Sequence, residues 1–98
     1  MQYPNEMVEN MLRAYYTLQQ SPDPEYSDLF IDLSRGLKTL KKNNKTLYYT
    51  VVNVFVNGIP IQDYATDDGV TTRMITYRLT DGLELLTRIM NGDTNYEG

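Results

Sequence analysis

The sequence predicts a small all-α domain of about five helices. Apolar residues recur at three- and four-residue steps through most of the 98-residue chain, and this spacing is typical of one buried helix face. Proline, asparagine and glycine residues separate these stretches, where helices usually begin or end. One stretch has the composition of a β-strand, but the sequence offers no second strand to pair with it.

The first predicted helix runs from about Asn5 to Gln20. Its apolar face consists of Met7, Val8, Met11, Leu12, Tyr15 and Leu18. The segment 21–24 contains two prolines, which end a helix and restrict the residue before them. We therefore interpret residues 1–22 as an N-terminal helical arm and residues 23–92 as the main domain. Residues 93–98 are expected to form a flexible tail.

The second predicted helix runs from about Glu25 to Lys42. Its apolar stripe comprises Tyr26, Leu29, Phe30, Leu33, Leu37 and Leu40. Gly36 interrupts this helix at a cost of about 1 kcal/mol relative to alanine. Asn43 and Asn44 are expected to end it and to cap the next helix.

The segment Thr46 to Val56 gives two conflicting signals. It is rich in β-branched and aromatic residues, which favour a strand. Its apolar residues also keep helical spacing, and the following Asn57-Gly58 pair is typical of a helix end. We predict a third helix here, and the alternative is a β-hairpin that turns near Gly58.

Two further helices are predicted after this segment. A short helix over about 60–66 is followed by a turn of Asp67, Asp68 and Gly69 and by a long helix over 72–91, with Thr71 as its N-cap. Ala65 is small enough for a second helix to cross it, and Gly69 tolerates a positive φ. Ile75 points back at the first helix of the pair. This spacing predicts a C-terminal helix-turn-helix. Its buried side is extended by Tyr64, Val70, Leu79, Leu83 and Leu86.

The stretch from about Leu29 to Met90 resembles region four of bacterial sigma factors, which reads the −35 promoter element. It is also similar to small ArpU-like phage transcription regulators. The residues that match the family pattern are Leu37, Leu40, Phe55, Val56, Gly58, Tyr64, Ala65, Gly69, Thr71, Ile75, Leu79, Leu83 and Leu86. Tyr64 replaces the usual isoleucine or valine. Asp81-Gly82 stands where the family often has Arg-Ala, which lowers the expected affinity for the DNA backbone.

The resemblance implies that the helix over 72–91 enters the major groove of DNA with its exposed N-terminal residues. The exposed positions are Thr72, Arg73, Thr76, Tyr77 and Thr80. Thr72, Arg73 and Tyr77 fall where region four touches bases, and Thr76 falls where it reaches bases or phosphates. Arg73 is the strongest candidate, because a guanidinium can bond O6 and N7 of guanine at once.

Contacts to phosphate are expected beside the base-reading residues. The backbone amides of Thr71 and Thr72 can hold a phosphate. Arg78 is expected to touch phosphate or to pair with Asp81 or Glu84. A second basic group consists of Lys38, Lys41, Lys42 and Lys45. The alternative for Arg73 and Arg78 is that they are solvated surface residues, and the alternative for the lysines is a solvated helix end favoured by the dipole.

Seven of the nine tyrosines can be divided by their helical positions. Those on apolar faces, which are expected in the core, are Tyr15, Tyr26, Tyr48 and Tyr64. Those expected at the surface are Tyr16, Tyr49 and Tyr77. The sequence thus favours packing over a platform for base stacking.

Composition argues against an enzyme. Histidine and cysteine are both absent, which removes the usual general base, the thiolate nucleophile and the commonest metal ligands. We therefore expect no catalytic activity, no cofactor and no metal. No apolar run approaches the roughly 20 residues of a membrane helix and no signal peptide is visible, so we expect a protein of the bacterial host cytoplasm.

Charge is distributed unevenly along the chain. The net charge is −4; the first 34 residues carry one basic and six acidic residues, and the remaining 64 carry eight and seven. This distribution suits an acidic front half and a DNA-facing back half, and it equally suits a plain acidic bacterial protein.

The sequence thus predicts a phage-encoded, sequence-specific regulator of transcription that binds double-stranded DNA. One recognition helix reads only a few base pairs, so we expect a homodimer that forms through the N-terminal helix. One alternative is a protein-interaction module that binds RNA polymerase or a host regulator. Another is the DNA-recognition part of a phage packaging protein.

Overall fold

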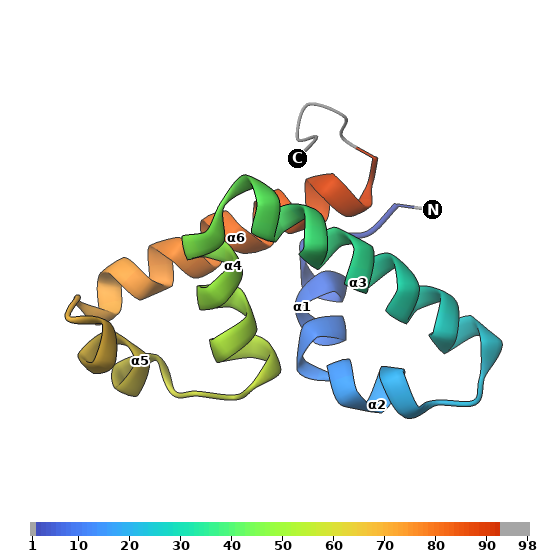
Figure 1. The fold of residues 1–98 in the computed structure, drawn as a ribbon, viewed down its shortest axis with the longest axis horizontal. Helices are drawn as coiled ribbons and strands as arrows, with labels where there is room; N and C mark the ends of the chain where they lie inside the picture. Colours follow the sequence, from blue (N-terminus) through green and yellow to red (C-terminus); the bar gives the residue numbers. More distant parts are fainter. Residues whose placement is uncertain (1, 93–98) are drawn as a thin grey trace.

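The computed structural model describes residues 2–92, and every regular element in this range is helical. The elements are α1 (Asn5–Arg13), α2 (Tyr15–Gln20), α3 (Pro24–Asn43), α4 (Lys45–Val51), the π-helical segment η1 (Val52–Val56), α5 (Ile61–Asp68) and α6 (Thr72–Met90). The predicted all-α class is confirmed. Figure 1 shows α6 lying along the molecule, with α5 at one end and α2 and the start of α3 at the other. The predicted tail at 93–98 lies outside the described residues.

The first predicted helix is two helices, because the chain bends at Ala14 (φ −97°, ψ 17°). The bend lets the ring of Tyr15 pack edge-on against Phe30 of α3, with the ring centroids 5.1 Å apart. Val8 and Leu12 of α1 are completely buried, and α1 packs against α3, η1 and α6.

The burial of α1 corrects the expected role of the N-terminal arm. The apolar stripe that was expected to contact a second copy is part of the core of its own chain. A homodimer through this stripe would require α1 to leave that core, which would expose Val8, Met11 and Leu12 to water.

The helix α3 follows the predicted boundaries closely. Asp23 caps its N-terminus by accepting a hydrogen bond from the backbone N–H of Glu25 at 2.9 Å, and Pro24 occupies the first turn, where its missing N–H costs nothing. Leu33, Leu37 and Leu40 form its buried side.

The segment Thr46 to Val56 is helical, so the alternative hairpin is excluded. Asn44 caps α4 by accepting from the backbone N–H of Leu47 at 3.1 Å, as the sequence predicted. The second half widens into the π-helix η1, and Asn57 donates to the carbonyl of Val52, five residues back, at 2.9 Å. Burial of Val51, Val54 and Phe55 outweighs their preference for strands.

Two glycines lie where helices cross α6. An ideal Cβ built on Gly82 of α6 would lie 2.6 Å from Cγ2 of Val51 in α4. A Cβ built on Gly36 of α3 would lie 2.8 Å from Cγ of Met90 in α6. Both glycines are buried, and the absence of a side chain lets the helices approach closely. Gly36 is therefore a packing position, not only an interruption of α3.

The beginning and end of the described chain are joined by hydrogen bonds. The backbone N–H of Tyr3 donates to Oδ1 of Asn91 at 2.6 Å, and Nδ2 of Asn91 donates to the carbonyl of Tyr3 at 3.0 Å. The Tyr3 hydroxyl donates to Oδ2 of Asp32 in α3 at 2.5 Å. These contacts fasten the N-terminal segment to α3 and to the end of α6.

Candidate nucleic-acid interface

The helices α5 and α6 are joined by a tight turn at Gly69. Gly69 has φ +70°, in the left-handed region that glycine adopts without strain. The N–H of Val70 donates to the carbonyl of Ala65 at 3.0 Å, and the N–H of Gly69 donates to that of Thr66 at 3.3 Å. This pair of bonds is a Schellman motif. Asp67 and Asp68, which were predicted in the turn, form the last residues of α5 instead.

The first turn of α6 is fixed by a cap and by burial. The Thr71 hydroxyl accepts a hydrogen bond from the backbone N–H of Met74 at 3.1 Å, which confirms the predicted N-cap. Ala65 of α5 and Ile75 of α6 are 2% and 0% exposed, and the two helices pack against each other. The N-terminal half of α6 is therefore held rigidly on α5.

The side of α6 opposite its buried stripe carries most of the predicted base-reading residues. Arg73, Tyr77 and Thr80 are exposed there, and Thr72 and Thr76 are exposed nearer the edge of the buried stripe. Nε of Arg73 donates to the Tyr77 hydroxyl at 2.8 Å, and the guanidinium lies over the Tyr77 ring at 5.5 Å from its centroid. The sequence analysis named both residues separately, and their four-residue spacing is compatible with this contact.

The threonines on this face use their hydroxyl protons inside the helix. Thr76 and Thr80 donate to backbone carbonyls four residues back, at 3.0 and 3.1 Å. Their methyl groups and oxygen lone pairs stay available for contacts outside the helix.

Arg78 has a different partner from the one expected. Its Nη1 donates to Oδ2 of Asp68 at 2.8 Å in an ion pair, and Nη2 lies 3.7 Å from Sδ of Met74. Asp81 and Glu84 are not its partners, because Arg78 leaves α6 on the flank that faces the end of α5. At about 100° per residue, Arg73 and Arg78 point roughly 140° apart around the helix.

Three lysines of the second basic group, Lys41, Lys42 and Lys45, lie in different surroundings and do not form one patch. Nζ of Lys41 lies over the rings of Tyr48 and Tyr49, at 5.4 and 5.7 Å from their centroids. Lys45 and Arg78 line one hollow of about 430 Å³ between α4 and the α5–α6 pair, and Tyr49 lies in its wall. Lys42 is exposed at the end of α3 and does not line this hollow. The sequence alone does not predict that Lys45 and Arg78 lie close together, because they are 33 positions apart in the chain.

The tyrosines follow the predicted division in part: Tyr15, Tyr48 and Tyr64, which were predicted in the core, are partly buried and pack against it. Tyr16, Tyr49 and Tyr77 are 54%, 45% and 55% exposed, as expected for surface residues. Tyr26 was predicted in the core but is 49% exposed, because it lies at the rim of an open groove between α1 and α3. Tyr3, which the sequence did not single out, is buried.

Neither a metal-binding cluster nor a membrane-spanning helix occurs among the described residues. Within residues 2–92, no three histidine, cysteine, aspartate or glutamate residues gather where they could hold a metal ion. No helix in this range combines the length and apolar character needed to cross a membrane. Comparisons with protein-family models, with curated proteins and with solved structures found no match to this chain.

Proposed function

We propose that α5 and α6 form a helix-turn-helix and that the chain regulates transcription by binding double-stranded DNA. The proposal includes a phage origin and action in the cytoplasm of the bacterial host. It rests above all on Arg73, an exposed cation in the first turns of α6 that the Tyr77 hydroxyl orients. A side chain held in this way loses less conformational freedom when it binds a base.

Arg73 and its neighbours supply the chemistry of base recognition. Only Nε of Arg73 is engaged by Tyr77, so both terminal nitrogens can donate to O6 and N7 of guanine. The methyl groups of Thr76 and Thr80 suit thymine methyl groups in the same groove. Loss of the Arg73 contact is expected to weaken binding to the preferred site by about 1–3 kcal/mol, or roughly 5- to 150-fold.

Phosphate contacts would come from both sides of α6. Thr71 and Thr72 present backbone amides at the positive end of the helix dipole. Lys45 and Arg78 flank the hollow beside α4, and a phosphate there would compete with Asp68 for Arg78. These cations are few and the net charge is −4, so one copy would bind DNA weakly, with a shallow dependence on salt.

The test is selection of duplexes from a randomised DNA pool at near-physiological salt. The wild-type chain is compared with Arg73→Ala, with Arg73→Lys and with a matched control, Arg35→Ala. Arg35 is an exposed residue of α3, so its removal changes the net charge equally without altering the first turns of α6, where Arg73 lies. Arg73→Lys keeps the charge but loses the two-pronged geometry.

The expected result is a short motif that Arg73→Ala and Arg73→Lys relax at one position and that Arg35→Ala leaves unchanged. An unselective pool with the wild-type chain would overturn the proposal. If Arg35→Ala and Arg73→Ala weaken DNA binding equally, Arg73 contributes only its positive charge and does not read a base.

A protein-binding role is the second candidate, and the acidic residues on α6 favour it. Asp81 and Glu84 are exposed and share a hollow with Arg88 and Leu85, on a helix that would otherwise face phosphates. On this alternative α6 binds RNA polymerase or a host regulator. Binding to purified polymerase that Asp81→Ala and Glu84→Ala weaken, together with no DNA selection, would support it.

A further inference from the structure

A groove between α1 and α3 combines an apolar lining with acidic residues. It encloses about 460 Å³ and is lined by Tyr3, Met7, Glu25, Tyr26, Asp28, Leu29 and Asp32. This volume lies within the usual range of ligand pockets, about 300–1,000 Å³. No basic side chain lines it.

We propose that this groove binds a short basic peptide segment of a partner protein, with one apolar side chain seated between α1 and α3. The occupant is defined by charge complementarity, because three carboxylates line the groove and oppositely charged surfaces attract and orient partners. The first 34 residues, which supply all seven lining residues, contain a single basic residue, Arg13. Arg13 is paired with Glu9 at 3.0 Å.

The apolar side chains of the groove stay partly exposed, although α1 and α3 bury other apolar side chains in the core. Tyr26 is 49% exposed, and Met7 and Leu29 are only partly buried. Large apolar side chains that stay partly exposed beside a cavity are typical of binding sites for apolar anchors. The peptide's apolar side chain would cover Met7, Tyr26 and Leu29.

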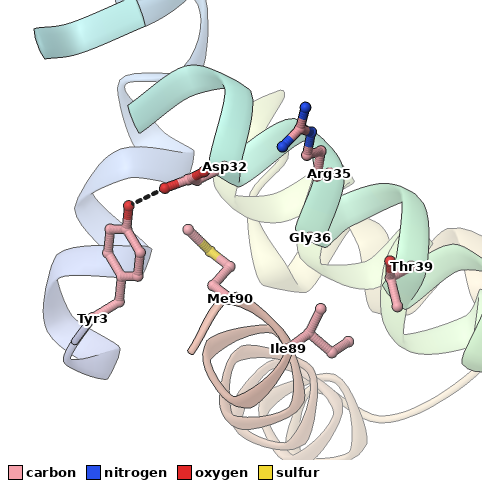
Figure 2. A pocket seen from close by; sticks show the side chains of 7 residues that line it. All are labelled: Tyr3, Asp32, Arg35, Gly36, Thr39, Ile89 and Met90. Atoms are coloured by element: carbon pink, nitrogen blue, oxygen red, sulfur yellow. Dashed lines mark hydrogen bonds between the residues drawn. The ribbon is translucent and has the colours of Figure 1, made fainter. Parts of the chain in front are cut away.

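Tyr3 and Asp32, which both line the groove, are joined by a hydrogen bond. Figure 2 shows the Tyr3 hydroxyl pointing at the Asp32 carboxylate, to which it donates at 2.5 Å. One hydroxyl proton leaves the Asp32 carboxylate with further acceptor positions for a lysine or arginine of the peptide. Burial, the hydrogen bond to Asp32 and the charges of Asp32 and Asp28 raise the pKa of Tyr3 to about 12. The negative charges of Asp28 and Asp32 are therefore close enough to affect the Tyr3 hydroxyl, which lies in the lining of the groove.

The groove is separate from the proposed DNA-binding face. Glu25, Tyr26, Asp28 and Leu29 belong to the first turns of α3, which begin at the opposite end of the molecule from α5 (Figure 1). Tyr3 and Asp32 also form part of a neighbouring hollow whose far side carries Arg35 (Figure 2). The peptide proposal therefore stands or fails independently of DNA binding.

The experiment is selection of short random peptides displayed on phage against the immobilised full chain. Enriched peptides are then labelled, and their binding is measured by fluorescence anisotropy at low and at near-physiological salt. Asp28→Asn and Tyr26→Ala alter the groove at exposed positions. Asp63→Asn of α5 and Ile31→Ala, an exposed apolar residue of α3 outside the groove, are the matched controls.

The expected result is enrichment of peptides that combine lysine or arginine with leucine, methionine or phenylalanine. Each groove variant should weaken their binding about fivefold or more, and each control should change it less than about twofold. Enrichment of neutral or acidic peptides, no enrichment, or equal binding by Asp28→Asn would overturn the proposal. Concentration-dependent dimers that Tyr26→Ala abolishes would show that a second copy occupies the groove instead.

Discussion

Replacing Gly82 with alanine is expected to destabilise the fold, although alanine is the better helix former. The substitution gains about 1 kcal/mol in helix propensity. The added Cβ would lie 2.6 Å from Cγ2 of Val51 and 3.4 Å from the backbone oxygen of Leu47. Val51 is branched and completely buried, so it can move only with α4, and overpacking of this kind costs about 1–3 kcal/mol. Subtracting the gain leaves an expected net loss of up to about 2 kcal/mol.

The reasoning can be isolated with a double-mutant cycle. Val51→Ala removes the clashing Cγ2, at an expected cost of about 2 kcal/mol for the lost burial. In that background, Gly82→Ala should no longer clash, so it should stabilise the protein by about 0.5–1 kcal/mol. The coupling between the two sites is therefore expected to be roughly 2 kcal/mol.

Urea unfolding followed by circular dichroism measures all four free energies, and thermal unfolding should show shifts of about 4–8 °C per kcal/mol. Gly36→Ala is the comparison. Its Cβ would meet Cγ of Met90 at 2.8 Å and Cδ1 of the buried Leu86 at 3.0 Å. Both contacts are with the ends of unbranched or flexible side chains rather than with a branched Cγ or backbone, and Met90 is partly exposed beside a hollow, so a smaller loss than for Gly82→Ala is expected. A stabilised Gly82→Ala protein, or the same effect with and without Val51→Ala, would refute the close approach of α4 and α6.

Three other predictions address the N-terminal segment and the proposed interface. Leu12→Ala should lower the free energy of unfolding in urea by about 2–5 kcal/mol, because Leu12 is completely buried. A loss under about 1 kcal/mol would instead support the interpretation of residues 1–22 as a separate arm. The pKa of Tyr3 is raised from its ordinary value to about 12, so this residue's contribution to stability is complete below about pH 10 and is lost as the pH rises to about 12. The stability difference between the wild type and Tyr3→Phe should therefore shrink over that range, and a constant difference would contradict the assignment. Arg78→Ala should lower stability by less than about 1 kcal/mol, because its ion pair with Asp68 is partly exposed. If Arg78 contacts phosphate, the slope of log affinity for DNA against log salt should also fall by about one, and an unchanged slope would exclude that contact.

Local signals in the sequence located most of the helices and their ends. Asn44 and Thr71 were identified as caps from residue type and position, and both accept the expected backbone hydrogen bond. Gly69 was identified as the turn because few other residues tolerate its φ of +70°. These features depend on neighbours within a few residues, so a single sequence is sufficient to predict them.

The candidate site was predicted less completely. The exposure of Arg73 and Tyr77 follows from helical periodicity, and their mutual contact at 2.8 Å is compatible with their spacing of four residues. The pairing of Arg78 with Asp68, and the hollow that Lys45 shares with Arg78, depend on how α4 and α5 pack against α6. Helical periodicity specifies a face of each helix but not which other helix covers it.

The sequence by itself determined the helical class, most of the helix ends and most of the residues that each helix keeps from water, because these follow from local hydrogen bonding and from apolar periodicity. Only the tertiary structure decided that the stripe of α1 is buried in its own chain, that Gly36 and Gly82 are crossing points, and that Tyr3 joins Asp32 and Asn91 across the fold. An apolar stripe has the same periodicity whether it meets its own chain or a partner. A glycine likewise does not reveal, in the sequence, which helix will pass over it.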